Sequence, residues 1–214
     1  MKIVPKKWNG LSKAEQEEIL RRSEADIDAV RSPVEEIIDE VQRKGDDALR
    51  RFTQRFDGAD ISKLPIAVEQ GEFARAEEML SEEVKEAIAY SVENVRRFYR
   101  NRRPEMLEFS TVRPGVLAAE RGTPIDSAGL YVPRGRGSFP SMLYMLSVPA
   151  AIAGVPQVSV ASPPNRDGSI DPGCLYTASL TGVSKVYRIG GAQAIAALAY
   201  GTESVDPGWK IIGP

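Results

Sequence analysis

From residue 129 onward, short apolar runs alternate with helix-forming segments that are rich in small residues. The pattern predicts strands over 129–133, 157–161, 185–189 and 210–212, separated by helices over 142–153, 174–181 and 192–200. Strands that alternate with helices in this way form a parallel sheet with helices packed over it. The apolar runs are continuous rather than alternating, which is typical of strands covered on both faces. The sequence therefore predicts an α/β fold for this part of the chain.

The chain before residue 129 is predicted to be mainly helical, with a few short strands. Ser12 and Glu15 have the spacing of a capping box, and Ser81 precedes a long amphipathic segment. Ser32 followed by Pro33 is expected to start another helix, because proline is tolerated in the first turn. The remaining expectations are a turn over 55–58, a strand over 64–68 and a β-hairpin formed by 109–113 and 116–121.

Composition narrows the classes of function. The 214 residues include no histidine and a single cysteine, Cys174, and the formal net charge is -2. Such a charge gives no general attraction to nucleic acid or to anionic membranes, and the arginines between 96 and 103 are interpreted as a solvated helix end. No apolar run reaches the length of a membrane span. One cysteine permits no internal disulfide, so we expect a cytoplasmic protein in which Cys174 is inert packing.

Two loops have the composition of a ligand site at the carboxyl edge of a parallel sheet, where ligands of such folds bind. Gly135 and Gly137 follow one expected strand, and Gly190 and Gly191 follow another. Glycine lets the backbone approach a ligand closely, and the amides at a helix N-terminus attract anions. The first loop lacks the third glycine of the dinucleotide fingerprint, because Pro140 stands there. On its own, this loop favours a tight structural turn.

Two side chains near these loops are candidates for contact with a ligand. Gln193 falls in the first turn of an expected helix, where its amide either reaches a ligand or faces solvent. Tyr131 lies in an expected strand, and its hydroxyl is either a hydrogen-bonding group for a nucleotide or the tip of a core residue. The sequence has no cluster with zinc-ligand spacing, no P-loop, and no histidine for a Ser-His or Cys-His pair.

Several stretches resemble the histidinol dehydrogenase family: GLYVPRG at 129–135, PSMLYMLSVPAAIAGV at 140–155, GGAQAIAALAYGTE at 190–203 and KIIGP at 210–214. The resemblance is weaker toward the N-terminus, through RFDG at 55–58, and the whole chain follows the first half of that enzyme in order. It implies an incomplete Rossmann-like, NAD-contacting domain with a parallel sheet over 129–214. A mainly helical α+β domain over 26–128 and an N-terminal helical arm over 1–25 precede it.

The resemblance implies an enzyme that oxidises L-histidinol to L-histidine with two molecules of NAD, requires zinc and forms a homodimer. Tyr131 and Gln193 match positions that contact NAD in the family, so they are the cofactor-binding residues that we expect. The family's zinc ligands and catalytic residues lie beyond the position of Pro214. The resemblance therefore assigns no metal-binding and no catalytic residue to this chain, which alone is expected not to turn over.

Two alternatives remain open. Arg134 and Arg136 stand where many family members have glycine and no arginine, which is compatible with a paralogous NAD-dependent dehydrogenase of another polar alcohol. Solvent-exposed loop charge is the simpler interpretation of these arginines. The other alternative is a stand-alone, non-catalytic fragment that binds nucleotide or has a structural role. Because the expected strand at 210–212 ends the chain, we also expect uncovered surface to favour dimerisation or other self-association.

Overall fold

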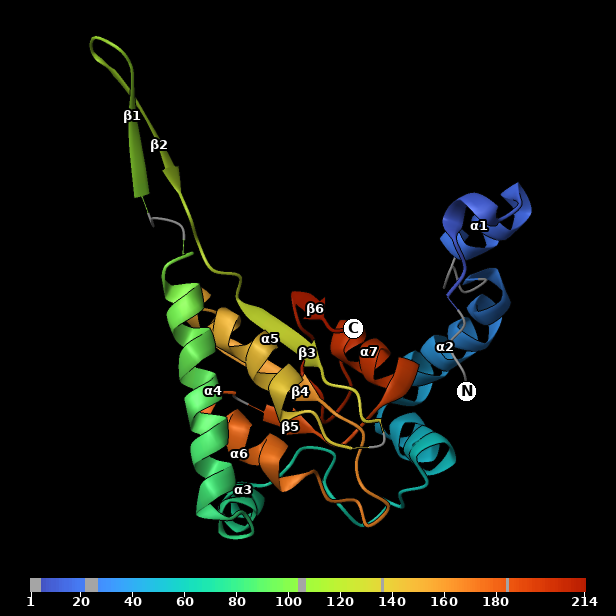
Figure 1. Ribbon diagram of the computed structural model, residues 1–214. Coiled ribbons are helices and arrows are strands. Elements are labelled where there is room, and N and C mark those ends of the chain that lie inside the picture. The colour runs from blue at the N-terminus through green and yellow to red at the C-terminus, as the bar shows by residue number, and fades with distance from the viewer. Residues whose placement is uncertain (1–4, 22–26, 104–106, 136, 184) are drawn as a thin grey trace. The chain divides into compact units, whose positions relative to one another are not determined.

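The structure, a computed structural model, describes residues 5–21, 27–103, 107–135, 137–183 and 185–214 (Figure 1). The chain divides into two units, Met1–Glu36 and Ile37–Pro214. The first unit contains a short 3-10 helix, η1 (Trp8–Gly10), and helix α1 (Lys13–Arg21). The predicted capping box starts α1: the Ser12 hydroxyl accepts the Glu15 N–H, and the Glu15 carboxylate accepts the Ser12 N–H at 2.9 Å.

The second unit contains a parallel sheet of four strands: β3 (Ser127–Tyr131), β4 (Gln157–Ala161), β5 (Lys185–Tyr187) and β6 (Lys210–Ile212). Their order across the sheet is β5-β4-β3-β6. The predicted alternation of strands and helices is confirmed, and β4 and β6 span the residues expected for them. The strands β3 and β5 both end two residues before their expected ends. The fold is thus the expected α/β arrangement.

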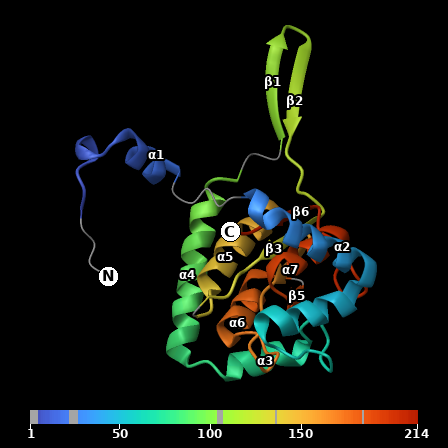
Figure 2. The same ribbon diagram turned by 90° about the vertical axis from the view of Figure 1, so that its right-hand side faces the viewer.

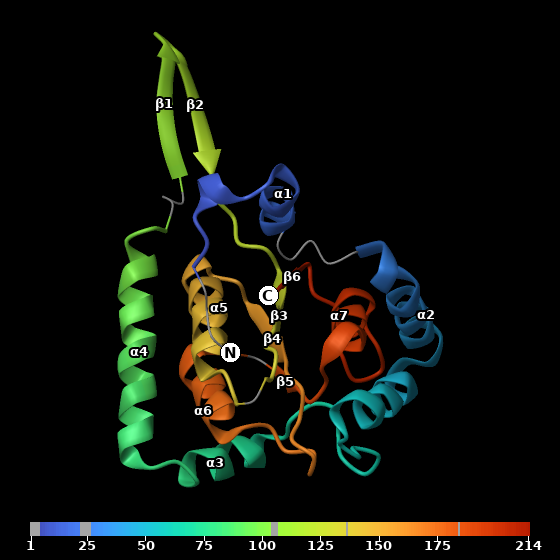
Figure 3. The ribbon, with the colours of Figure 1, turned by 45° about the vertical axis from the view of Figure 1, so that its right-hand side comes forward.

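Helices cover both faces of this sheet (Figure 3). Helices α5 (Pro140–Ala153) and α6 (Pro172–Thr181) lie on one face, and α7 (Gly191–Tyr200) lies on the other. Side chains of β3 alternate between the two resulting cores: Leu130 packs in the core beneath α5 and α6, and Tyr131 packs against the core that includes α7. Burial on both faces explains why the strands are continuously apolar in sequence.

Further helices pack outside the α5–α6 layer (Figure 2). Helix α4 (Glu82–Arg100) contacts α5 and α6, and α3 (Gln70–Glu78) contacts α6. Ser81 caps α4 as predicted, since its hydroxyl accepts the Val84 N–H at 3.4 Å. Cys174 is buried in α6, as expected, and this burial raises the pKa of its thiol to about 12. No helix of the described residues is both long enough and apolar enough to cross a membrane.

The predicted β-hairpin is also confirmed. Strands β1 (Leu107–Arg113) and β2 (Val116–Arg121) pair in antiparallel fashion as a separate two-stranded sheet (Figure 1). Gly115 allows the turn between them, because its φ of 79° lies in the left-handed region. Every residue of both strands is exposed, so the hairpin contributes nothing to the core.

The expected helix start at Ser32 is wrong. Helix α2 (Ile27–Phe52) begins five residues earlier, so Pro33 lies inside it. A proline there removes one backbone hydrogen bond, and the run of 26 residues is also interrupted by a kink at Gly45, whose φ of 50° and ψ of -128° are not helical. A π-helical turn, η2 (Thr53–Asp57), follows, and Gly58 ends it with a φ of 68°. The turn predicted over 55–58 is therefore confirmed.

The strand predicted over 64–68 is wrong as well. Only Ala67 forms a bridge, with Tyr187, and the Val68 N–H donates to the Val186 carbonyl at 2.8 Å. Pro65 has no N–H to donate, so a regular ladder cannot extend through this segment. The boundaries expected after residues 25 and 128 are predictions about domain organisation that the fold leaves open.

Candidate functional site

The strand order places a candidate ligand site at the carboxyl ends of β3 and β6. After β3 the chain adds β4 and then β5 on one side, and it then returns to place β6 on the other side of β3. Such a reversal is a topological switch point, and open α/β sheets bind ligands in the crevice at this edge. Tyr131 ends β3 there, and Gly213 follows β6 and approaches Tyr131 so closely that an added Cβ would lie 2.8 Å from the Tyr131 Cβ.

Tyr131 joins this edge to the loop that follows β5. Its hydroxyl oxygen accepts the N–H of Gly191 at 3.1 Å, while its ring is half-buried against the α7 core. The bond occupies the hydroxyl as an acceptor and leaves its own O–H free to donate. The ring of Tyr131 thus packs against the core as one interpretation expected, and the nucleotide-binding role of its hydroxyl stays a prediction.

The glycines of that loop are required by close contacts. A Cβ on Gly190 would lie 2.5 Å from the Pro163 Cγ, and one on Gly191 would lie 2.8 Å from the Gln193 Oε1. Gly191 also has a φ of 63°, a left-handed conformation that favours glycine. The loop after β4, which contains Pro163, and the loop after β5 thus meet without room for further side-chain atoms. The sequence analysis expected these glycines to approach a ligand, whereas the close contacts here are between segments of the chain itself, so the approach to a ligand stays a prediction.

Gln193 is the most unusual polar residue of the site. Its side chain is only 1% exposed, and neither Oε1 nor Nε2 has a hydrogen-bond partner among the described residues. The alternative that Gln193 is a solvated residue at a helix start is therefore wrong. Leaving a buried amide unpaired costs free energy of roughly 1–3 kcal/mol, so these two atoms require a partner such as an ordered water or a ligand.

The structure adds Asp57, which sequence reasoning had treated only as part of a turn. An oxygen of Asp57, Oδ1, lies 3.3 Å from the position of a Cβ on Gly190, and Oδ2 is buried without a hydrogen-bond partner. Burial raises the pKa of Asp57 to about 6, although the nearby Arg134 guanidinium opposes this shift. The only sequence signal near Asp57 was RFDG, in which the glycine predicts a turn but does not predict the contact with Gly190.

Of the two loop arginines considered in the sequence, the structure describes Arg134. Arg134 is exposed, and its Nη1 donates to the Pro164 carbonyl at 3.0 Å, so it spans the loops that follow β3 and β4. Arg136 lies outside the described residues. Arg134 is thus anchored at one nitrogen rather than wholly solvated, and it lies at the same edge as Asp57.

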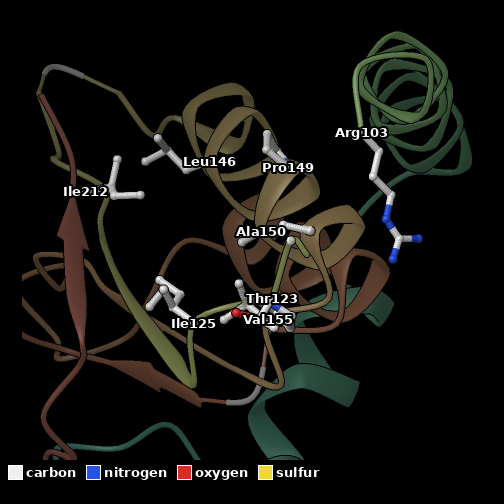
Figure 4. A pocket seen from close by; sticks show the side chains of 12 residues that line it. Arg103, Thr123, Ile125, Leu146, Pro149, Ala150, Val155 and Ile212 are labelled. Atoms are coloured by element: carbon white, nitrogen blue, oxygen red, sulfur yellow. The ribbon is translucent and has the colours of Figure 1, made fainter. Parts of the chain in front are cut away.

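An apolar cavity of about 400 Å³ lies elsewhere in the second unit (Figure 4). Its lining includes Ile125, Leu146, Pro149 and Ile212, with Arg103 at its margin. Leu146, Pro149 and Ala150 come from α5, so the cavity lies on the α5 face of the sheet, whereas Gln193 belongs to α7 on the other face. Its lining offers few polar groups and none of the residues that meet at the glycine loop.

A doubly wound α/β protein with a ligand site at its topological switch point is the class that this fold and site define. A family model described as histidinol dehydrogenase matches residues 20–214. The chain therefore belongs to the histidinol dehydrogenase family, and the resemblance noted in the sequence is confirmed.

Individual relatives agree with this family. Histidinol dehydrogenase homolog 2 of Mesorhizobium japonicum is 45% identical over 206 residues, which are 96% of this chain and 47% of the relative. Histidinol dehydrogenase of Methanothermobacter thermautotrophicus is 44% identical over 92% of this chain and 46% of its own length. The crystal structure of histidinol dehydrogenase from Elizabethkingia anophelis matches with a TM-score of 0.85 and 29% identity, covering 95% of this chain and 46% of that one. The chain spans about half the length of these relatives.

Proposed function

We propose that this chain is the N-terminal portion of a histidinol dehydrogenase-like oxidoreductase and that it supplies part of an NAD site. The complete enzyme would oxidise L-histidinol to L-histidine while two molecules of NAD are reduced. The family membership and the half-length match support this assignment. The observation that carries the NAD site is the buried, unpartnered amide of Gln193 at the switch-point edge.

The residues of this edge fit a nicotinamide dinucleotide, which when bound supplies the hydride acceptor. Gly190 and Gly191 carry no side chain, which lets a loop backbone come close to a bound ligand. Tyr131 has an O–H free to donate, because its oxygen already accepts from Gly191. Gln193 offers both a donor and an acceptor, the combination that a carboxamide or a ribose hydroxyl requires. In this proposal the chain orients the cofactor and performs no proton transfer of its own.

Zinc, which the family resemblance implies, is not matched by the residues of this chain. Among the described residues, no group of three or more His, Cys, Asp or Glu side chains is arranged to hold a metal ion. We therefore assign no zinc ligand and no metal-dependent step to these residues. Accordingly, we propose that the chain alone does not produce NADH from histidinol.

Direct binding measurements test the NAD site. We expect the chain to bind NADH weakly, because half of a site loses contacts while the entropic cost of association remains. Replacing Gln193→Ala or Tyr131→Phe should each weaken this binding by about fivefold to tenfold, the usual effect of one hydrogen-bonding group. Calorimetric titration with NADH gives the three dissociation constants.

Matched controls separate a local effect from general damage. Gln70→Ala removes an exposed glutamine from the first turn of α3, and Tyr90→Phe removes a hydroxyl from a tyrosine that is 72% exposed. Both control variants should bind NADH as the unmodified chain does. If Gln193→Ala and Tyr131→Phe also leave the affinity unchanged, the assigned NAD site is wrong.

A second candidate is a paralogous NAD-dependent dehydrogenase of another polar alcohol. Two observations favour keeping it: the relative from Mesorhizobium japonicum is named a homolog of histidinol dehydrogenase, and Arg134 places a cation at the site. A cation there suits an alcohol or cofactor that carries an anionic group. The longer enzyme containing this chain should then reduce NAD faster with an anionic alcohol than with L-histidinol. Faster turnover of L-histidinol would rule this candidate out.

A further inference from the structure

Asp57 is a half-buried carboxyl group that the protein leaves without a partner for one of its oxygens. It ends the π-helical turn η2, where Oδ1 faces the Gly190 backbone and Oδ2 is buried with no hydrogen-bond donor. Burial of a charged carboxylate is unfavourable unless hydrogen bonds or opposite charges compensate for the lost hydration. Among the described residues this compensation is incomplete, so the carboxylate has capacity to accept further hydrogen bonds.

Glu72 is a second half-buried carboxylate in the same unit, and its hydrogen bonds are made within the protein. Glu72 is paired directly with Arg188, whose Nη2 donates to the Glu72 Oε1, and this same oxygen accepts the Glu69 N–H at 3.0 Å. Burial acts to raise the pKa of Glu72, but these hydrogen bonds hold it below its usual range. Asp57 has the opposite shift, because it lacks such donors.

Arg134 lies at the same edge as Asp57, because it bonds the Pro164 carbonyl next to Pro163, and Pro163 and Asp57 both lie beside Gly190. The electrostatic effect of Arg134 on Asp57 is favourable, yet no ion pair joins the two within the described residues. Instead, the Arg134 Nη1 donates to the Pro164 carbonyl at 3.0 Å, which holds the arginine at the rim. The edge therefore presents an acceptor over the glycine loop and, beside it, an exposed guanidinium with further N–H groups.

We infer that Asp57 and Arg134 together recognise one ribose-phosphate unit of the dinucleotide, an inference that rests on the proposed NAD site. Asp57 accepts hydrogen bonds from the vicinal hydroxyls of the ribose, and Arg134 faces the phosphate. A diol supplies the two neutral donors that a desolvated carboxylate lacks, whereas a phosphate at the Asp57 position would be repelled. Rossmann-type sites likewise use a carboxylate to bind the ribose and a basic group to bind a phosphate.

The inference is tested by combining variants with nucleotides that keep or lack the diol. Adenosine monophosphate, its 2′,3′-dideoxy analogue and nicotinamide mononucleotide are titrated into the chain and into the variants Asp57→Asn and Arg134→Gln. Asp57→Asn should weaken the binding of the mononucleotide whose ribose contacts Asp57 by about tenfold. The affinity of the dideoxy analogue, which has no diol, should not change. Arg134→Gln should weaken both adenosine nucleotides equally if the unit is the adenosine half. A loss confined to nicotinamide mononucleotide assigns the pair to the other half.

Two control variants test whether the ribose-phosphate assignment can fail while the NAD site stands. Asp60→Asn, at an exposed carboxylate three residues away, and Arg113→Gln, on the exposed hairpin, should leave all affinities unchanged. If NADH binds and Tyr131→Phe weakens it while Asp57→Asn does not, the ribose-phosphate assignment is wrong and the NAD site stands. An equal loss for adenosine monophosphate and its dideoxy analogue in Asp57→Asn also overturns the assignment. If the chain binds none of the nucleotides or NADH, both proposals fail.

Discussion

The carboxyl edge of the sheet and the β1–β2 hairpin leave opposite kinds of groups without partners. At the edge, polar atoms of Gln193 and Asp57 are buried and have no hydrogen-bond partner among the described residues. The neighbouring Gly190 is so crowded that a side chain there would clash with Pro163. On the hairpin, apolar side chains lie in solvent: Phe109 is 66% exposed and Leu117 is 68% exposed. Buried polar groups that lack partners favour a small polar ligand, whereas exposed apolar groups favour another protein surface.

The hairpin has one apolar and one polar face. Phe109 pairs with Ala119, and because side chains alternate along strands, Leu107 and Leu117 share their face. Glu108 and its cross-strand partner Glu120 lie on the opposite face. An isolated two-stranded hairpin is marginally stable in water, so this one needs a partner surface to become firmly ordered. The carboxyl edge is thus the proposed ligand site, and the hairpin is the surface at which we expect self-association.

The largest expected effect is on the crowded edge. Gly190→Ala places a Cβ 2.5 Å from the Pro163 Cγ, so the loops after β4 and β5 must move apart. We expect the free energy of unfolding, measured in urea, to fall by roughly 3 kcal/mol, as for other overpacked sites. The matched control is Gly71→Ala in α3, where an added Cβ meets no atom within 4 Å and alanine favours the helix. Similar stability for both variants would show that the edge is not closely packed.

The next effect concerns the hairpin and self-association. Replacing Phe109 and Leu117 together by serine removes exposed apolar area, so it should weaken dimerisation by about 30-fold, or roughly 2 kcal/mol, without lowering the stability of the monomer. Light scattering over a range of concentrations and urea unfolding measure the two quantities. Replacing Glu108 and Glu120 by serine on the polar face serves as the control. A chain that stays monomeric at every concentration would remove the basis for treating the hairpin as an interface.

The same contrast explains what could be predicted from the sequence. The strands and helices after residue 127 are local patterns, so the apolar runs located β4 and β6, and the segment 174–181 located most of α6. Helix α3 was not predicted, because Glu69 rather than a serine, threonine, aspartate or asparagine stands at its N-cap. The error at 64–68 arose because a strand requires a partner, and only Ala67 finds one.

The candidate site was predictable only in part. The family resemblance indicated Tyr131 and Gln193, and the glycine loops indicated the edge, but their roles remain proposals. The burial of Gln193 and the position of Asp57 could not be predicted, because they depend on contacts between segments far apart in the chain. Asp57 faces Gly190 and is influenced by Arg134, and no periodicity or spacing encodes either relation. Tertiary packing, not local preference, decides which polar groups lack partners.

The smallest effect is the pH dependence of stability that Asp57 introduces. Burial raises its pKa from the ordinary 3.8 to about 6, so the folded state binds this proton more tightly than the unfolded state does. The contribution of Asp57 to stability is therefore full below about pH 4 and is lost as the pH rises through about 6. Since the side chain is partly exposed, solvent screening reduces the effect, and Asp57→Asn should stabilise the chain by only about 1 kcal/mol near pH 8. Urea unfolding at several pH values should show this gain vanish near pH 4.

The neighbouring carboxylate Asp60 provides a control of opposite sign. The backbone N–H of Ser62 donates to Asp60 at 2.9 Å and holds the pKa of this exposed carboxyl below its usual value. Its contribution is thus present above its unfolded pKa and lost as the pH falls, so Asp60→Asn should destabilise the chain near neutral pH. If both variants changed stability in the same direction at pH 8, desolvation would not distinguish Asp57. Asp57 would then behave as an ordinary surface carboxylate, and Gln193 would be the residue that still distinguishes the edge from the hairpin.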